Sequence, residues 1–477
     1  MTVLSFVLFL LVFVMIGSSA VLRSRNSNRD YYVASGQVSP FLVGLSAVAT
    51  NNSGYMFIGA IGYTYVTGLA SVWLMVGWIL GDFVTSLLIH KKLRQAAGRT
   101  GEVSYAGVLS QWLGKPGYRR LQVLAATITI LFLLAYASAQ LLAGSKALQA
   151  LFEWPLWAGA VIGATIVVIY CIAGGIRASI WTDAAQSTVM MVAMASLLFV
   201  AVSSVGGISG AVEQMSAVDG FLDWYPAELP FPGITGGVLF AVSWLFAGIS
   251  VIGQPHIMIR FMALDDPGHM VRARMWYYGW FTAFYAMAIG VGLLARIFLD
   301  NPATFDEELA LPMMAQQLMP PVMVGLILAG IFAATMSTAD SLILSCSAAL
   351  SHDLLPHQAE STAMARFTTV LMTAAALLLT FTNSQSVFAL VIMAWSVLAS
   401  AFAPLLIVYC SGGRPRENLA LMMVLGGVFV ALTWRWLGLH DAVYEGMPGI
   451  LSGLLIFAIA SRLPAHRSAE KITQGAT

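Results

Sequence analysis

Thr50-Asn51-Asn52-Ser53-Gly54 interrupts an apolar segment that is otherwise long enough to span a membrane. Leu42–Leu45 precede this run and Met56–Ile58 follow it. Within a lipid bilayer, polar side chains and helix-weakening residues are tolerated only where they face other protein segments or a water-filled cavity. The run therefore predicts a binding site beside a mid-membrane interruption.

The composition is that of an all-α polytopic membrane protein. Apolar residues make up 59% of the 477 positions and charged residues 9%, compared with about 25% charged residues in soluble domains. The chain has no basic stripe to neutralise phosphates, so a nucleic-acid partner is excluded. Cys171, Cys346 and Cys410 lie in apolar stretches without metal-ligand spacing and are interpreted as buried small hydrophobes.

Stretches of about 20 apolar residues predict thirteen membrane spans within a single transmembrane domain, residues 1–477. They lie near residues 3–22, 40–66, 70–90, 120–146, 156–174, 180–205, 234–254, 275–298, 320–350, 364–383, 386–411, 418–438 and 446–462. The first segment has no preceding basic region and no clear cleavage site, so we expect a retained helix rather than a signal peptide.

The distribution of positive charge predicts the orientation. Twenty of the 23 Lys and Arg residues fall on one side if these spans alternate, while the acidic loops near 213–228 and 306–308 fall on the other. Because Lys and Arg are enriched in cytoplasmic loops, we expect an outside N-terminus and a short cytoplasmic tail, residues 463–477, in a cell (inner) membrane.

Three carboxylates fall within predicted spans, where charges are expensive and usually functional. Asp82 lies within about two turns of Lys91 and Lys92, so a structural ion partner and a functional role are equally open. Asp183 begins the sixth span, either as a helix-start carboxylate or as a cation ligand. Asp340 is the deepest of the three.

The ninth span carries a polar face near Asp340. Helical spacing places Ala334, Ser337, Thr338 and Ser341 on one side. Hydroxyls and backbone carbonyls are oxygen ligands that suit sodium. The alternative is that these hydroxyls bond their own i−4 carbonyls or join neighbouring helices.

A second interruption ends the seventh span, where Gly248, Gly253 and Pro255 permit a broken helix. Paired interruptions in two halves of a membrane protein indicate an inverted repeat with a site between the halves. The repeats would cover about 40–205 and 234–411, with the extra helix 3–22 in front and two terminal helices at 418–462. We interpret the nearby His256 as a satisfied interfacial residue rather than a proton relay.

Several motifs resemble those of the sodium:solute symporter family, and within it those of the bacterial sodium/proline symporters. They are Arg29-Asp30-Tyr31-Tyr32, Ser46-Ala47-Val48-Ala49 with Ser53-Gly54, Trp181-Thr182-Asp183, Gly253-Gln254-Pro255-His256 with Arg260-Phe261-Met262-Ala263, and Met336-Ser337-Thr338. The resemblance implies a five-plus-five inverted-repeat transporter fold with discontinuous helices.

The resemblance also implies the site residues. One sodium would bind the carbonyls of Ala49, Asn52 and Ala334 and the hydroxyls of Ser337 and Thr338. A second sodium, present in some members, would bind Asp183, Ser337, Asp340 and Ser341. The solute would lie beside Asn51, Ser53, Gly54, Tyr55, Tyr136, Ala247 and Val251.

Four of these positions depart from the proline symporters. Those proteins carry an aspartate at Asn51, a tryptophan at Tyr55, and a tryptophan and a tyrosine at Ala247 and Val251. A charge is therefore missing and the aromatic walls are smaller, so we expect room for a bulkier solute than proline.

We predict sodium-coupled uptake of a small organic solute, most simply an amino acid such as proline, by alternating access. The partners would be the solute, sodium and the lipid bilayer, with no cofactor beyond the coupling ion. The alternatives are symport of another solute (a carboxylate, a sugar acid or another amino acid), proton coupling through Asp340 or Asp183, an uncoupled facilitator and a membrane sensor. No Ser/His or His/Asp pair falls at helical spacing at depth, so an enzyme is not expected.

Overall fold

The computed structural model describes residues 1–462 except 24, 26, 227, 228, 230, 232, 300–305, 356–360, 383–385 and 442. These described residues form helices and no β-strand, apart from one isolated bridge between Val38 and Leu264. The all-α prediction is confirmed. The predicted tail, 463–477, lies outside the described residues.

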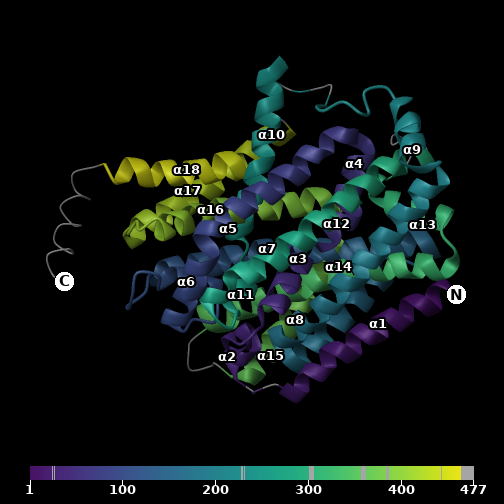
Figure 1. Ribbon diagram of the computed structural model, residues 1–477. Coiled ribbons are helices and arrows are strands. Elements are labelled where there is room, and N and C mark those ends of the chain that lie inside the picture. Colours follow the sequence, from purple (N-terminus) through teal and green to yellow (C-terminus); the bar gives the residue numbers. More distant parts are fainter. Residues whose placement is uncertain are drawn as a thin grey trace.

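The long helices lie roughly side by side in one bundle, with α1 at one edge and α17 and α18 at the opposite edge (Figure 1). The helices are α1 (Thr2–Ser19), α2 (Asn28–Val33), α3 (Pro40–Tyr55), α4 (Ile61–Thr67), α5 (Val72–Thr100), α6 (Tyr105–Ser110), α7 (Arg119–Phe152), α8 (Leu156–Ser204), α9 (Gly207–Ser216), α10 (Gly233–Ile249), α11 (Pro255–Met262), α12 (Met270–Phe298), α13 (Ala310–Leu318), α14 (Pro321–Ala348), α15 (Thr362–Thr382), α16 (Val387–Cys410), α17 (Glu417–Trp436) and α18 (Gly446–Ala460).

Ten helical segments of the described chain are long and apolar enough to cross a membrane. Two of them each contain two predicted spans, and each has a glycine with a positive φ between those spans. Gly68 (φ +74°) divides Pro40–Thr100, and Gly175 (φ +54°) divides Leu156–Ser204. The helix α18 is shorter than the ten. The protein is therefore a multi-pass membrane protein, and the count of thirteen spans stays a prediction.

The bundle has a buried centre made by α14 and α16, while α1 and α17 are the most exposed long helices. The helix α14 packs against α3, α7 and α8. A membrane helix that faces lipid on one side needs apolar side chains there, whereas a helix surrounded by protein can carry polar ones. The placement of α14 therefore explains how it accommodates Ser337, Thr338, Asp340 and Ser341.

The two predicted interruptions are both present as breaks in helices. In α3 the break lies at Ser53, whose φ of 47° and ψ of 178° are not helical, and a π-helical turn, Met56–Ala60, follows. The second break follows α10, where the turn Ser250–Gly253 ends the helix and Gln254 adopts an extended conformation before Pro255 begins α11. Each break brings backbone polar groups into the middle of the bundle.

The break in α8 at Gly175 packs against α2, the short helix that follows α1. A Cβ added at Gly175 would lie 2.4 Å from the carbonyl oxygen of Tyr31, so only glycine fits this close approach. Nearby, Arg177 Nη2 donates to Asp30 Oδ1 at 2.6 Å. Burial raises the pKa of Asp30, but the hydrogen bonds and charge of Arg177 and the amide of Arg25 outweigh it, so the net pKa lies below its usual value. Asp30 is thus an ionised anchor for α2.

Candidate functional site

The broken turn of α3 is positioned by a side chain from α7. Gln140 Oε1 accepts a hydrogen bond from the Gly54 amide at 2.8 Å, which satisfies a backbone donor that the break leaves without a helical partner. The space around Gly54 is closed, because a Cβ there would lie 2.5 Å from Thr335 Cγ2. Gly54 therefore allows α3 to approach both α7 and α14.

The substitution Gly54→Ala should lower the free energy of unfolding by about 1–3 kcal/mol, because the added methyl overpacks the contact with Thr335. The effect is measurable as a lower Tm of the purified protein in detergent. Gly279→Ala is the matched control, since nothing lies within 4 Å of the position of its added Cβ. Equal Tm values for the two variants would contradict this packing argument.

The hydroxyls predicted to bind the first sodium face the broken helix. Ser337 Oγ donates to the carbonyl oxygen of Ala49 at 3.3 Å and to that of Ala334 at 3.1 Å. Thr338 Oγ1 donates to the carbonyl oxygen of Thr50 at 3.1 Å. Four of the five predicted ligands, Ala49, Ala334, Ser337 and Thr338, therefore lie together, with Thr50 as an addition that the sequence reasoning missed.

These oxygens fit a small hard cation. Oxygen ligands about 2.4 Å from such an ion, at right angles to one another, lie about 3.4 Å apart. The oxygen–oxygen distances of 3.1 to 3.3 Å are close to that separation. The fifth predicted ligand, Asn52, has its carbonyl engaged by the Met56 amide, while both polar atoms of its buried side-chain amide lack a partner. Asn52 can thus bind an ion by its side chain.

The residues predicted for a second sodium surround a guanidinium group instead. Arg260 of α11 is fully buried, and its Nη2 lies 3.4 Å from Asp183 Oδ2 and 3.6 Å from Asp340 Oδ1. The same nitrogen donates to Ser179 Oγ at 2.6 Å and also bonds Ser341 Oγ. The guanidinium of Arg260 therefore occupies the position between the two carboxylates in this structure.

Asn51 points away from the first sodium set and towards α12. Its Nδ2 donates to the Tyr277 hydroxyl at 2.5 Å, and that hydroxyl donates to Asp82 Oδ2 at 2.8 Å. None of the ion pairs among the described residues joins Asp82 to Lys91 or Lys92. Lys92 Nζ instead donates to the carbonyl oxygen of Cys410 at 2.5 Å. Asp82 is therefore connected to the broken helix and not to the membrane interface.

The remaining predicted solute residues lie around buried aromatic rings. Tyr55 packs between Trp78 and Phe388, with ring centroids 5.6 and 5.4 Å away. Ala247 and Val251 are buried, and the indole of Trp395 in α16 donates to the Ala247 carbonyl oxygen at 3.2 Å. Part of the room that these small residues leave is thus filled by Trp395, so the expectation of free volume for a bulkier solute holds only in part.

Tyr136 lies beside His256, which the sequence analysis placed at the membrane interface. Its ring lies 5.5 Å from that of His256 and 6.3 Å from that of Trp395. His256 is fully buried, and neither of its ring nitrogens has a hydrogen-bond partner. The prediction of a satisfied interfacial histidine is therefore wrong, because Pro255 starts a new helix, α11, that turns into the bundle. The Tyr136 hydroxyl also lacks a partner, so polar atoms converge on this point.

A cavity of about 330 Å³ lies beyond the aromatic rings, on the side predicted to face outside. Its lining includes Tyr63, Trp244, Phe388, Arg435, Tyr444 and Glu445. Tyr63 and Phe388 stack at 5.5 Å, and Phe388 in turn contacts Tyr55. These rings separate the cavity from the broken helix, so this conformation is closed towards that side.

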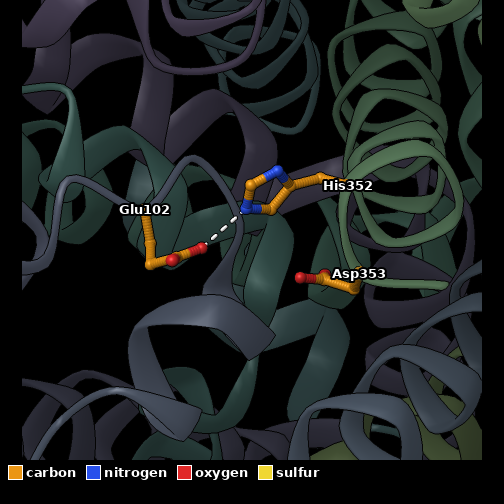
Figure 2. A group of neighbouring side chains, drawn as sticks. All are labelled: Glu102, His352 and Asp353. Atoms are coloured by element: carbon orange, nitrogen blue, oxygen red, sulfur yellow. Dashed lines mark hydrogen bonds and ion pairs between the residues drawn. The ribbon is translucent and has the colours of Figure 1, made fainter. Parts of the chain in front are cut away.

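On the side predicted to be cytoplasmic, three side chains from distant segments meet (Figure 2). Glu102 follows α5, whereas His352 and Asp353 lie in the π-helical turn Ala349–Leu354 after α14. His352 Nε2 lies 2.6 Å from Glu102 Oε2. Asp353 Oδ1 accepts from Ser104 and Gln122, both at 2.8 Å. These contacts join the α5–α6 connection to the end of α14 and close this side of the bundle as well.

Comparisons with known proteins agree with this arrangement. The sodium/proline symporter of Escherichia coli is 27% identical over 97% of this chain and 93% of its own length. The high-affinity proline transporter of Bacillus subtilis is 27% identical over 92% and 93%. A solved Na+-coupled sialic acid symporter superposes with a TM-score of 0.81 at 18% identity, over 95% of this chain and 96% of that one.

A second solved structure and a sequence profile complete the comparisons. A transporter of the nucleobase-cation-symport-1 family superposes with a TM-score of 0.59, over 92% of this chain and 94% of that one, at 15% identity. The fold is therefore that of these solved transporters, with inverted repeats and discontinuous helices, and the relatives at 27% identity are transporters rather than enzymes. The sequence profile of the sodium:solute symporter family matches residues 31–427. From this match over most of its length, the chain belongs to the sodium:solute symporter family.

Proposed function

We propose that this protein takes up a small amino acid together with sodium, and that proline is the first candidate solute. The observation that carries the proposal is the cluster of hydroxyl and carbonyl oxygens between the break in α3 and the face of α14. The curated relatives named above are proline transporters, which supports proline. The neutral Asn51, in place of the expected carboxylate, is the reason to test other amino acids and carboxylates.

The coupling mechanism follows from the position of the sodium site and the solute site on the same broken turn of α3. A sodium ion held by Ala49, Asn52 and Ser337 would fix the broken turn of α3 against α14. Ser53, Gly54 and Tyr55 continue that turn, so the ion would order the segment that contacts the solute. Each ligand then lowers the cost of ordering the site for the other, which is a reciprocal coupling free energy. The membrane potential adds about 2.3 kcal/mol per charge per 100 mV to inward movement.

One coupling sodium is sufficient in this proposal. The guanidinium of Arg260 already lies between Asp183 and Asp340, 3.4 and 3.6 Å from their oxygens. A second sodium between these carboxylates would place two cations in one buried cluster, unless the Arg260 side chain moved away. We therefore assign the two aspartates and Ser341 to a resident ion cluster that joins α8, α11 and α14.

The proposed orientation places the N-terminus outside and the C-terminus in the cytoplasm of a cell with an inner membrane. The 330 Å³ cavity would then face outside and the Glu102–His352 contact would face the cytoplasm. Alternating access would open these two closures in turn. An uncoupled facilitator would lack this reciprocity, and a sensor would bind solute without moving it.

Purified protein in proteoliposomes should accumulate proline against its gradient when sodium is outside, and should not when potassium replaces sodium at the same pH. A thermal-shift series of amino acids and small carboxylates, in sodium and in potassium, identifies the solute: a ligand at 100 times its Kd adds about 2.7 kcal/mol of stability. Uptake that stops at equilibrium would favour a facilitator. A ligand that stabilises the protein in sodium without being transported would favour a sensor.

A further inference from the structure

Asp82 is a buried carboxylate for which the proposed transport cycle has no role. It lies on α5, is fully buried, and accepts one hydrogen bond at Oδ2 from the Tyr277 hydroxyl at 2.8 Å. Its other oxygen, Oδ1, has no hydrogen-bond partner. Within the described residues no Lys, Arg or His nitrogen lies within 4.0 Å of it.

The helices packed around Asp82 supply hydroxyls but no matching cation. The helix α10 approaches by its backbone at Gly248, where a Cβ would lie 2.7 Å from the Asp82 amide nitrogen, and α10 contains no titratable side chain. From α12, Tyr277 and Tyr278 face the carboxylate, with Arg274 behind Tyr278. From α11, Arg260 is engaged by Asp183 and Asp340, and His256 faces Tyr136.

Of the other titratable groups on the same helix, His90 is the nearest to Asp82 in sequence. His90 is two turns beyond Asp82, is fully buried, and stacks on Phe261 at 3.8 Å. It is too far along α5 to share a hydrogen bond with Asp82, because eight residues of helix span about 12 Å. His90 is therefore a matched control rather than a partner.

An ionised carboxylate in this position would be very unfavourable without a nearby cation. Burying an unpaired charge at membrane depth costs several kcal/mol or more, and such groups become neutral instead. By contrast, Asp183 and Asp340 both lie beside the guanidinium of Arg260. Of Asp82, Asp183 and Asp340, Asp82 is thus the one without a neighbouring guanidinium in the described structure, so an ionised Asp82 needs a cation from elsewhere.

A chain of hydrogen bonds connects Asp82 to the broken turn. Asn51 Nδ2 donates to the Tyr277 hydroxyl, and that hydroxyl donates to Asp82, so both donors point towards the carboxylate. Asn51 stands between Thr50 and Asn52, which lie at the proposed sodium site. An ionised Asp82 strengthens both hydrogen bonds and the attraction for a cation at the turn, whereas a protonated Asp82 weakens them.

We propose that Asp82 binds a proton in competition with sodium: it is protonated when the sodium site is empty and ionised when the site is filled. The inference rests on the proposed sodium coupling and adds a proton to it. When sodium binds, the carboxylic acid releases its proton to water and becomes the carboxylate. When sodium leaves, water returns a proton, so no other reactant is needed.

The competition predicts how sodium affinity depends on pH. With full competition between one proton and one sodium, the KM for sodium rises tenfold for each pH unit below the point at which Asp82 becomes protonated, and it is constant well above that point. Asp82→Asn cannot release a proton, so its KM for sodium should be independent of pH and higher than the constant high-pH KM of the native protein. His90→Asn should retain the native dependence.

The test uses the full-length protein in weakly buffered detergent solution, with a pH-sensitive dye and bound ²²Na measured in parallel. The native protein should release up to one proton per sodium bound, potassium should release none, and Asp82→Asn should bind sodium more weakly without releasing protons. Bound sodium without proton release in the native protein would overturn the inference and leave sodium coupling intact. Release from Asp82→Asn equal to that of the native protein would also overturn it, and absence of ²²Na binding would refute the sodium coupling itself.

Discussion

Sodium-driven accumulation should fall to the background level of empty liposomes when Ser337→Ala and Thr338→Ala are combined. The two hydroxyls are the only side-chain oxygens that α14 contributes to the predicted first sodium set, and they reach the carbonyls of Ala49 and Thr50 across the helix interface. Alanine removes two ligands and leaves those carbonyls without their present donors. The measurement is uptake of labelled solute at saturating and at limiting sodium.

Ser345→Ala is the control for this double variant. Ser345 lies on the same helix and its hydroxyl bonds only the carbonyl oxygen of Ser341, at 2.8 Å, among the contacts described for it. It should keep the native KM for sodium. If the double variant also keeps that KM, the oxygens between α3 and α14 are not the coupling site, whatever the solute proves to be.

Arg260→Gln should be the most destabilising single substitution in the bundle. It leaves Asp183 and Asp340 as buried carboxylates without their cation, and removing one partner from a buried ion cluster costs about 3–5 kcal/mol. The expected result is a large decrease in Tm and in the yield of folded protein. Thermal unfolding in detergent, with intrinsic tryptophan fluorescence as the signal, measures it.

Two further variants separate the cost of unpaired charge in Arg260→Gln from the cost of the packing that the arginine side chain provides. The double substitution Arg260→Gln with Asp183→Asn removes one charge of each sign and should recover part of the lost stability. Arg260→Lys keeps the charge but lacks the planar guanidinium that serves several oxygens at once, so it should fall between the native protein and Arg260→Gln. A double variant no more stable than Arg260→Gln would show that the cost does not come from unpaired charge.

Much of the architecture could be predicted from the sequence, because long apolar segments mark the helices that cross the membrane and polar interruptions mark the breaks in them. The thirteen predicted segments each coincide with helical residues, and the interruptions at 50–54 and 248–255 correspond to breaks at Ser53 and at Ser250–Gly253. The hydroxyl face of α14 was also predictable, because helical spacing determines which residues share a side. Its contact with Ala49 came only from the family resemblance.

Partners from different spans could not be predicted, because hydropathy gives depth but not which faces of two helices meet. Arg260 appeared as part of a cytoplasmic cluster of positive charges, yet α11 carries it inwards to Asp183 and Asp340. The proximity of Asp82 to Lys91 in sequence left an interfacial ion pair and a functional role equally open, whereas the structure joins Asp82 to Tyr277. Trp395 fills space beside Ala247 from a span that showed no polar signal.

The two hydrogen bonds of Trp395 give α16 a mechanical role. Its indole donates to the Ala247 carbonyl on one side of the break, and its own carbonyl accepts from Gln254 Nε2 at 2.9 Å on the other. Phe388, in the stack below the 330 Å³ cavity, lies on the same helix about 10 Å away, at 1.5 Å per residue. The helix α16 is thus bonded to the broken segment through Trp395 and contributes Phe388 to the aromatic closure. If the broken segment tilts, α16 is expected to move with it and to displace Phe388. A change at the solute site can thus open the aromatic closure through this one helix.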